Sequence, residues 1–157
     1  MEDQLDFKLV NAKEAKEEWM LDFDFEGDIA EIYINGQEII PFLKEIEEPY
    51  AAEEGHPDIA GAYGHRLPKK LYKELMEAFE EGTYVNQEGA ELLCCGGCGL
   101  SCCWSIVVFI KQDERYVYWY KFEHNHREWE YNLSYKFDKK DYMQALEVLK
   151  KGFSVEE

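Results

Sequence analysis

The sequence predicts a single α+β domain, in which a mainly antiparallel sheet built from hairpins and meanders is combined with two or three helices. Three observations support this prediction. The chain has 157 residues, which suits one domain spanning residues 1–157. Short segments of strand-like composition cluster near the start of the chain and again in its second half. Between and after these clusters, apolar residues recur every three or four positions, as they do in helices.

Seven short segments have the composition of strands. In most of them apolar and polar side chains alternate, whereas the segment at 104–111 is almost wholly apolar and is predicted to be buried. Asn35-Gly36 and Asp113-Glu114 are expected to form turns between neighbouring strands. The expected strands are 5–9, 20–25, 29–34, 90–94, 104–111, 116–122 and 128–137.

Three segments have helical spacing. The expected helices are 39–47, 68–82 and 138–150. Pro41 is compatible only with the first turn of the first helix, and Asp138 is a suitable N-cap for the last. Residues 49–68 contain several prolines and glycines but no period, so they are expected to form an irregular connection.

The charge of the chain limits its partners. Seventeen Lys and Arg against 34 Asp and Glu give a net charge of −17. Residues 1–55 alone hold 17 acidic and 4 basic side chains. Such a field repels phosphate backbones and anionic lipids, which predicts no nucleic-acid and no membrane binding, and it favours a basic protein partner. Acidity that only maintains solubility is the alternative explanation.

Several features predict a cytoplasmic protein. The acidic opening MEDQLDF lacks the pattern of a signal peptide. The longest apolar run, 102–110, has nine residues, whereas a membrane-spanning helix needs about twenty. The five cysteines all fall within ten positions, unlike those of a disulfide scaffold, and this clustering suits a reducing compartment or a metal site.

Cys95 and Cys98 form a C-x-x-C pair in a glycine-rich turn. Zinc, the candidate cofactor, prefers four ligands in tetrahedral geometry, so other side chains would have to complete the site. The residues considered for this are Cys102, Cys103, His124 and His126. Small buried thiols in a tight turn are the alternative, because free cysteine is often an apolar core residue. A thioredoxin-like role is disfavoured because the pair precedes a strand rather than a helix.

Polar side chains also gather in residues 53–66 and 123–128. Carboxylates, histidines, a tyrosine and arginines could bind a ligand or perform acid–base chemistry if the fold brings them together. Exposed loops with ordinary solvated residues are the alternative for both segments. The ligand-binding candidates are Glu54, His56, Asp58, Tyr63, His65 and Arg127.

Most of the chain resembles a family of bacterial proteins of unknown function. The matching strings are IYING at 32–36, EIEEPYAAEEGHPDIAGAYG at 45–64, LLCCGGCGLSCCW at 92–104, VYWYKFEHNHREWEY at 117–131 and FDKKDYMQAL at 137–146. Members of the family carry a C-x-C-G-x-x-G-C-W-like turn, where this chain has extra cysteines. The resemblance implies a soluble bacterial cytoplasmic protein and supplies no activity, substrate or catalytic residue.

The leading hypothesis from the sequence is a non-enzymatic, acidic protein-binding module of the inhibitor or immunity type that acts on a basic partner. It rests on the net charge, the aromatic-rich strands and the lack of a recognised catalytic motif. The first alternative is a small metal-binding or thiol-dependent enzyme that uses the Cys94–Cys103 turn with His124 and His126. The second is a ligand-binding domain with residues 53–66 as a lid.

Overall fold

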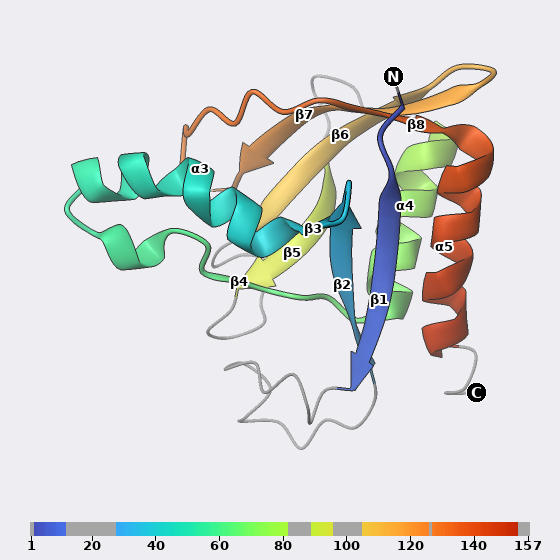
Figure 1. The fold of residues 1–157 in the computed structure, drawn as a ribbon, viewed down its shortest axis with the longest axis horizontal. Helices are drawn as coiled ribbons and strands as arrows, with labels where there is room; N and C mark the ends of the chain where they lie inside the picture. Colours follow the sequence, from blue (N-terminus) through green and yellow to red (C-terminus); the bar gives the residue numbers. More distant parts are fainter. Residues whose placement is uncertain (1, 12–27, 82–88, 96–104, 126, 154–157) are drawn as a thin grey trace.

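Two antiparallel sheets form the framework of the structure (Figure 1), a computed structural model that describes residues 2–11, 28–81, 89–95, 105–125 and 127–153. The strand orders are β1-β2-β3 and β4-β5-β6-β7-β8, so each sheet follows the chain as a meander. The strands are β1 (Leu5–Asn11), β2 (Asp28–Ile34), β3 (Gln37–Glu38), β4 (Tyr63–Gly64), β5 (Ala90–Cys95), β6 (Ile106–Gln112), β7 (Tyr116–His124) and β8 (Tyr135–Asp138).

The helices of the described residues form two groups, one at each end of the molecule (Figure 1). They are α3 (Ile39–Glu53), the short 3₁₀ helix η1 (Pro57–Ile59), α4 (Pro68–Glu81) and α5 (Lys139–Phe153). Figure 1 shows α4 and α5 side by side against the strands, while α3 and η1 project at the other end. The predicted α+β fold with a mainly antiparallel sheet is therefore confirmed. Within the described residues, no helix combines the length and the apolar character needed to cross a bilayer.

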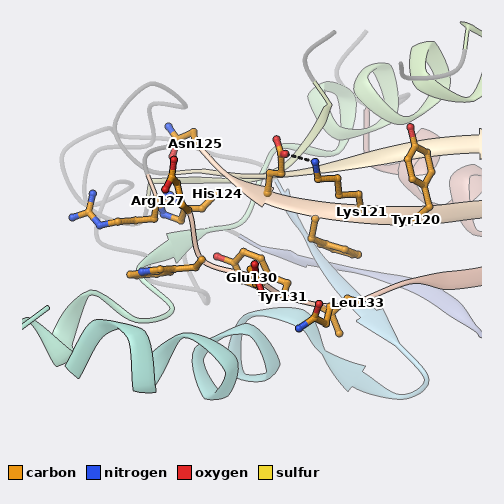
Figure 2. Close-up of a pocket in the computed structure, with 13 residues that line it drawn as sticks. Tyr120, Lys121, His124, Asn125, Arg127, Glu130, Tyr131 and Leu133 are labelled. Atoms are coloured by element: carbon orange, nitrogen blue, oxygen red, sulfur yellow. Dashed lines mark ion pairs between the residues drawn. The ribbon is translucent and has the colours of Figure 1, made fainter. Parts of the chain in front are cut away.

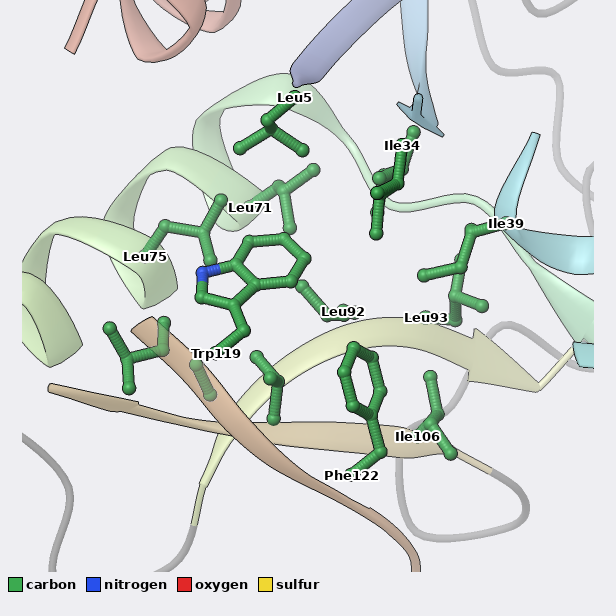
Figure 3. Close-up of a cluster of buried hydrophobic side chains, with 14 of the residues drawn as sticks. Leu5, Ile34, Ile39, Leu71, Leu75, Leu92, Leu93, Ile106, Trp119 and Phe122 are labelled. Atoms are coloured by element: carbon green, nitrogen blue, oxygen red, sulfur yellow. The ribbon is translucent and has the colours of Figure 1, made fainter. Parts of the chain in front are cut away.

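The core lies where α4 and α5 pack against the strands, and Trp119 of β7 is its largest fully buried side chain. Figure 3 shows its indole ring lying against Leu71 and Leu75 of α4. The ring also meets Phe137 edge-on at a centroid distance of 5.2 Å, and its Nε1–H donates to the Tyr142 hydroxyl at 3.2 Å. The high aromatic content of the chain thus fills this core with few residues.

Two isolated backbone bridges link the sheets. Asp3 pairs with Phe137 in parallel fashion, and Ala30 of β2 pairs antiparallel with Arg66, which follows β4. The second bridge includes a hydrogen bond from the Ala30 N–H to the Arg66 carbonyl at 3.0 Å. The segment after β4 is therefore held against the three-stranded sheet.

Local sequence signals predicted several features correctly. Asn35 and Gly36 have φ values of 53° and 80°, as a tight hairpin turn between β2 and β3 requires. Asp138 caps α5, because its Oδ1 accepts hydrogen bonds from the backbone N–H groups of Lys140 and Asp141 at 3.0 and 3.1 Å. Five of the seven expected strands are present with shifts of a few residues at their ends, and the expected strand at 20–25 lies outside the described residues.

The first helix was predicted too short, and the connection after it too irregular. α3 continues past residue 47, through Pro49, to Glu53, and η1 and β4 give structure to the rest of 49–68. The helix continues because its buried inner face repeats every four residues, at Leu43, Glu47 and Ala51. Tertiary packing of this face outweighs the hydrogen bond that Pro49 cannot donate.

The predicted strand at 128–137 is wrong in its first part, since within this segment only residues 135–137, which belong to β8, pair with β7. Asn132 has a φ of 51°, in the left-handed region, which interrupts an extended chain. Instead, Trp129 donates a hydrogen bond to the Glu54 carboxylate, and Tyr131 donates one to the Glu47 carboxylate. These long-range bonds replace sheet pairing in this segment.

Candidate functional site

Glu47 lies on the inner face of α3 and has no exposed surface. Its Oε1 accepts a hydrogen bond from the Gly61 N–H at 2.8 Å. Its Oε2 accepts one from the Tyr131 hydroxyl at 2.7 Å and a second, short one from the Tyr63 hydroxyl. A buried carboxylate needs such partners, because an unsatisfied one would cost several kcal/mol. Glu47 was not among the residues predicted from the sequence, although its place in the four-residue apolar repeat of α3 was a signal for burial.

The electrostatics of this cluster follow from its burial. Desolvation raises the pKa of Glu47 above its usual value of 4.5, and the three hydrogen-bond donors offset this only in part. Burial and the neighbouring Glu47 also raise the pKa of Tyr63 and of Tyr131, so both hydroxyls keep their protons and remain donors.

A second carboxylate fixes the C-terminal end of α3. Glu54 accepts hydrogen bonds from Arg127 Nε at 3.0 Å and from Trp129 Nε1 at 2.7 Å. One turn earlier, the Tyr50 ring stacks on Trp129 with a centroid distance of 6.1 Å, and its hydroxyl donates to the Glu130 carbonyl at 3.3 Å. We call the contacts of Glu47 and Glu54 with Gly61, Tyr63, Arg127, Trp129 and Tyr131 the α3 clamp.

The polar segments singled out in the sequence therefore meet in space. The α3 clamp joins residues 45–64 to residues 127–131, which are far apart in the chain. The cysteine-containing strand meets them through β4, where Tyr63 pairs with Cys95 and Gly64 with Cys94. Segments that lie far apart in the sequence thus meet in one structural junction beside α3.

The structure distributes the six ligand-binding candidates over three places. Glu54, Tyr63 and Arg127 belong to the α3 clamp. His65 is buried and its Nε2 lies 3.0 Å from Glu38 Oε1. His56 and Asp58 are exposed at η1.

Of the predicted metal ligands, the structure describes the side chain of His124 alone. This histidine ends β7, is buried, and lies beside the rings of Tyr63 and Trp129 at centroid distances of 6.1 and 5.3 Å. The others lie outside the described side chains; they are Cys95, Cys98, Cys102, Cys103 and His126. The zinc hypothesis and the thiol-dependent enzyme therefore stay predictions.

A cleft of about 880 Å³ opens between the end of β7 and the returning segment 127–133 (Figure 2). Polar and aromatic side chains line it, among them Lys121, His124, Arg127 and Trp129. Lys121 forms an ion pair with Glu123 at 2.7 Å inside the cleft.

The outer face of α3 is acidic. Four exposed carboxylates, which we call the acidic ridge, lie on α3 and η1: Glu45, Glu48, Glu53 and Asp58. Residues 39–58 contain only one Lys or Arg, Lys44. Within the part of the chain that the structure describes, no ion pair reaches the ridge carboxylates. Their charge therefore faces solvent.

Gly61→Ala is expected to lower the free energy of unfolding by about 2–4 kcal/mol. Gly61 has a φ of 71°, and a Cβ there would lie 2.7 Å from Lys44 Cβ on α3, so the substitution adds a steric clash to backbone strain. Gly55→Ala is the matched control, because its φ is 83° but its Cβ would meet nothing within 4 Å. Urea denaturation measures both variants, and equal losses would exclude the clash.

Comparison with known proteins assigns no family. No family model, curated protein or solved structure matches the chain. The fold and the site define an α+β protein that fixes an acidic helix through a buried carboxylate. The case for function therefore rests on the chain's own residues.

Proposed function

We propose that the protein is a non-enzymatic binding module whose acidic ridge docks on a basic protein, as an inhibitor or immunity-type protein would. The observation that carries this proposal is the ridge itself: exposed carboxylates on the outer face of a helix whose inner face is fixed by the α3 clamp.

A rigid helix suits this role for an energetic reason. Binding costs free energy when side chains and loops must be ordered, so carboxylates already held on a fixed helix lose less on association. The net charge of −17 adds an attraction that reaches about 8–10 Å through physiological salt and guides a basic surface toward the ridge. The same charge disfavours nucleic acid and anionic membranes as partners. A cytoplasmic location fits the five closely spaced cysteines.

Removing the charges of the three glutamates of the ridge is expected to slow association with the partner by about tenfold or more. The variant carries Glu45→Gln, Glu48→Gln and Glu53→Gln. Basic proteins that bind the immobilised chain at low salt are first identified by mass spectrometry. The association rate of each purified protein is then measured by surface plasmon resonance at about 50 and about 500 mM salt.

The matched control removes the same three charges elsewhere, through Glu77→Gln, Glu80→Gln and Glu114→Gln, all at exposed positions away from α3. Support requires that the ridge variant bind more slowly than this control. Equal slowing of both variants would mean that net charge alone drives binding. Affinity that does not change with salt would contradict the electrostatic proposal outright.

A further inference from the structure

We propose that Glu31, Glu38 and His65 form a binding site for a divalent transition-metal ion, a role that goes beyond docking of a basic partner. Each residue offers one donor atom, and the three atoms lie within 4.8 Å of one another. Ligands about 2.1 Å from a metal are at most about 4.2 Å apart, so small side-chain rotations complete the set.

The backbone positions of these three ligands are fixed by strand pairing. Glu31 lies in the middle of β2 and Glu38 ends β3, which pairs with β2. His65 follows β4 and is adjacent to Arg66, whose carbonyl accepts the bridging hydrogen bond from Ala30. The site thus spans the junction of the two sheets: two ligands lie on paired strands and the third directly follows a strand, a placement that suits a defined geometry.

The side chains behave as ligands would. Glu38 stands at the N-cap of α3 but makes no capping hydrogen bond with its side chain; its carboxylate instead faces His65. Glu31 is held from the outside by the Tyr33 hydroxyl, which donates to its Oε1 at 3.1 Å. The His65 side chain is only 8% exposed whereas that of Glu38 is 28% exposed, so an ion reaches the pair from the carboxylate side.

The donor set indicates the kind of ion. Two carboxylates and one imidazole suit Mn²⁺, Fe²⁺ or Zn²⁺, whereas Mg²⁺ and Ca²⁺ prefer oxygen ligands alone. Three protein ligands also leave coordination positions open for water. The net charge of −17 favours the approach of any cation.

Mn²⁺ is the probe of choice, because thiolates of the cysteine turn would compete for Zn²⁺. The purified chain is first treated with chelator and then titrated with Mn²⁺, followed by electron paramagnetic resonance. We expect one Mn²⁺ per chain with a ¹⁴N coupling from the imidazole. Glu38→Gln and Glu31→Gln should each weaken binding at least tenfold, and His65→Gln should abolish the ¹⁴N coupling.

The control variants are Glu48→Gln and His56→Gln, both exposed and outside the site; they should bind Mn²⁺ as the parent does. If His65→Gln fails to fold, Glu31→Gln decides the question, because Glu31 is partly exposed. The proposal is overturned if the parent chain binds no Mn²⁺, or if Glu31→Gln and Glu38→Gln bind it unchanged. Neither result bears on docking at the acidic ridge, which is measured without metal.

Discussion

Replacing Glu47 by alanine is expected to lower the free energy of unfolding by about 3–5 kcal/mol. The change removes the acceptor for two buried tyrosine hydroxyls and the Gly61 N–H, and it leaves a cavity under α3. Glu47→Gln keeps the volume and one acceptor, so we expect a smaller loss of about 1–2 kcal/mol. Urea denaturation followed by circular dichroism measures both.

Glu48→Ala is the control for this change, because it removes an exposed carboxylate from the next position on the same helix. Its effect should be within about 0.5 kcal/mol. A loss for Glu47→Ala no larger than that would show that the α3 clamp contributes nothing to stability.

The raised pKa of Glu47 adds a pH dependence to the same prediction. Above about pH 4.5 the unfolded chain has released the proton that the folded chain still holds. The free energy of unfolding therefore falls as pH rises from 4.5 through the folded pKa, and this contribution levels off above it. Glu47→Gln cannot titrate, so its stability curve should lack this fall. Parallel curves for the parent and the glutamine variant would contradict the pKa shift.

Trp119→Ala is expected to lower the free energy of unfolding by about 3–5 kcal/mol as well. The indole is fully buried, packs edge-on against Phe137, and donates to the Tyr142 hydroxyl. Since a domain of this kind has about 5–15 kcal/mol in total, the loss removes a large share of the stability and should lower the melting temperature by roughly 6–20 °C. Thermal denaturation followed by near-ultraviolet circular dichroism provides the measurement.

Tyr118→Ala is the control for Trp119→Ala. Tyr118 precedes Trp119 on β7, and its side chain points to the opposite, partly exposed face of the sheet. We expect a loss of about 1 kcal/mol there, because the ring keeps contact with solvent and its hydroxyl donates to Asp113 at the surface. Similar losses for both variants would mean that the aromatic core is not concentrated around Trp119.

Short-range signals in the sequence determined much of the fold. The Asn35-Gly36 turn, the Asp138 cap and the apolar face of α4 were all predicted correctly. Each depends on residues within a few positions of one another, so a local pattern contains the information needed. The alternation of β7 likewise follows from which side chains one strand can bury, and β6 is mostly buried, as its almost wholly apolar sequence predicted.

Tertiary structure alone decided the site. In the string E-I-E-E, Glu47 differs from the exposed Glu45 and Glu48 only by its place in the helical repeat. Its burial depends on hydroxyls of Tyr63 and Tyr131, which lie 16 and 84 residues away along the chain.

The same distance explains the errors in prediction. The helix α3 continues through Pro49, and residues 127–134 do not join the sheet, because the two segments form hydrogen bonds with each other. Local propensities cannot predict such bonds between distant residues. Composition and local periods alone determined an acidic α+β chain. Contacts between distant segments decided the role of each carboxylate, since these contacts set its burial and its hydrogen bonds. They made Glu47 a buried anchor, left the ridge carboxylates exposed, and placed Glu31 and Glu38 beside His65.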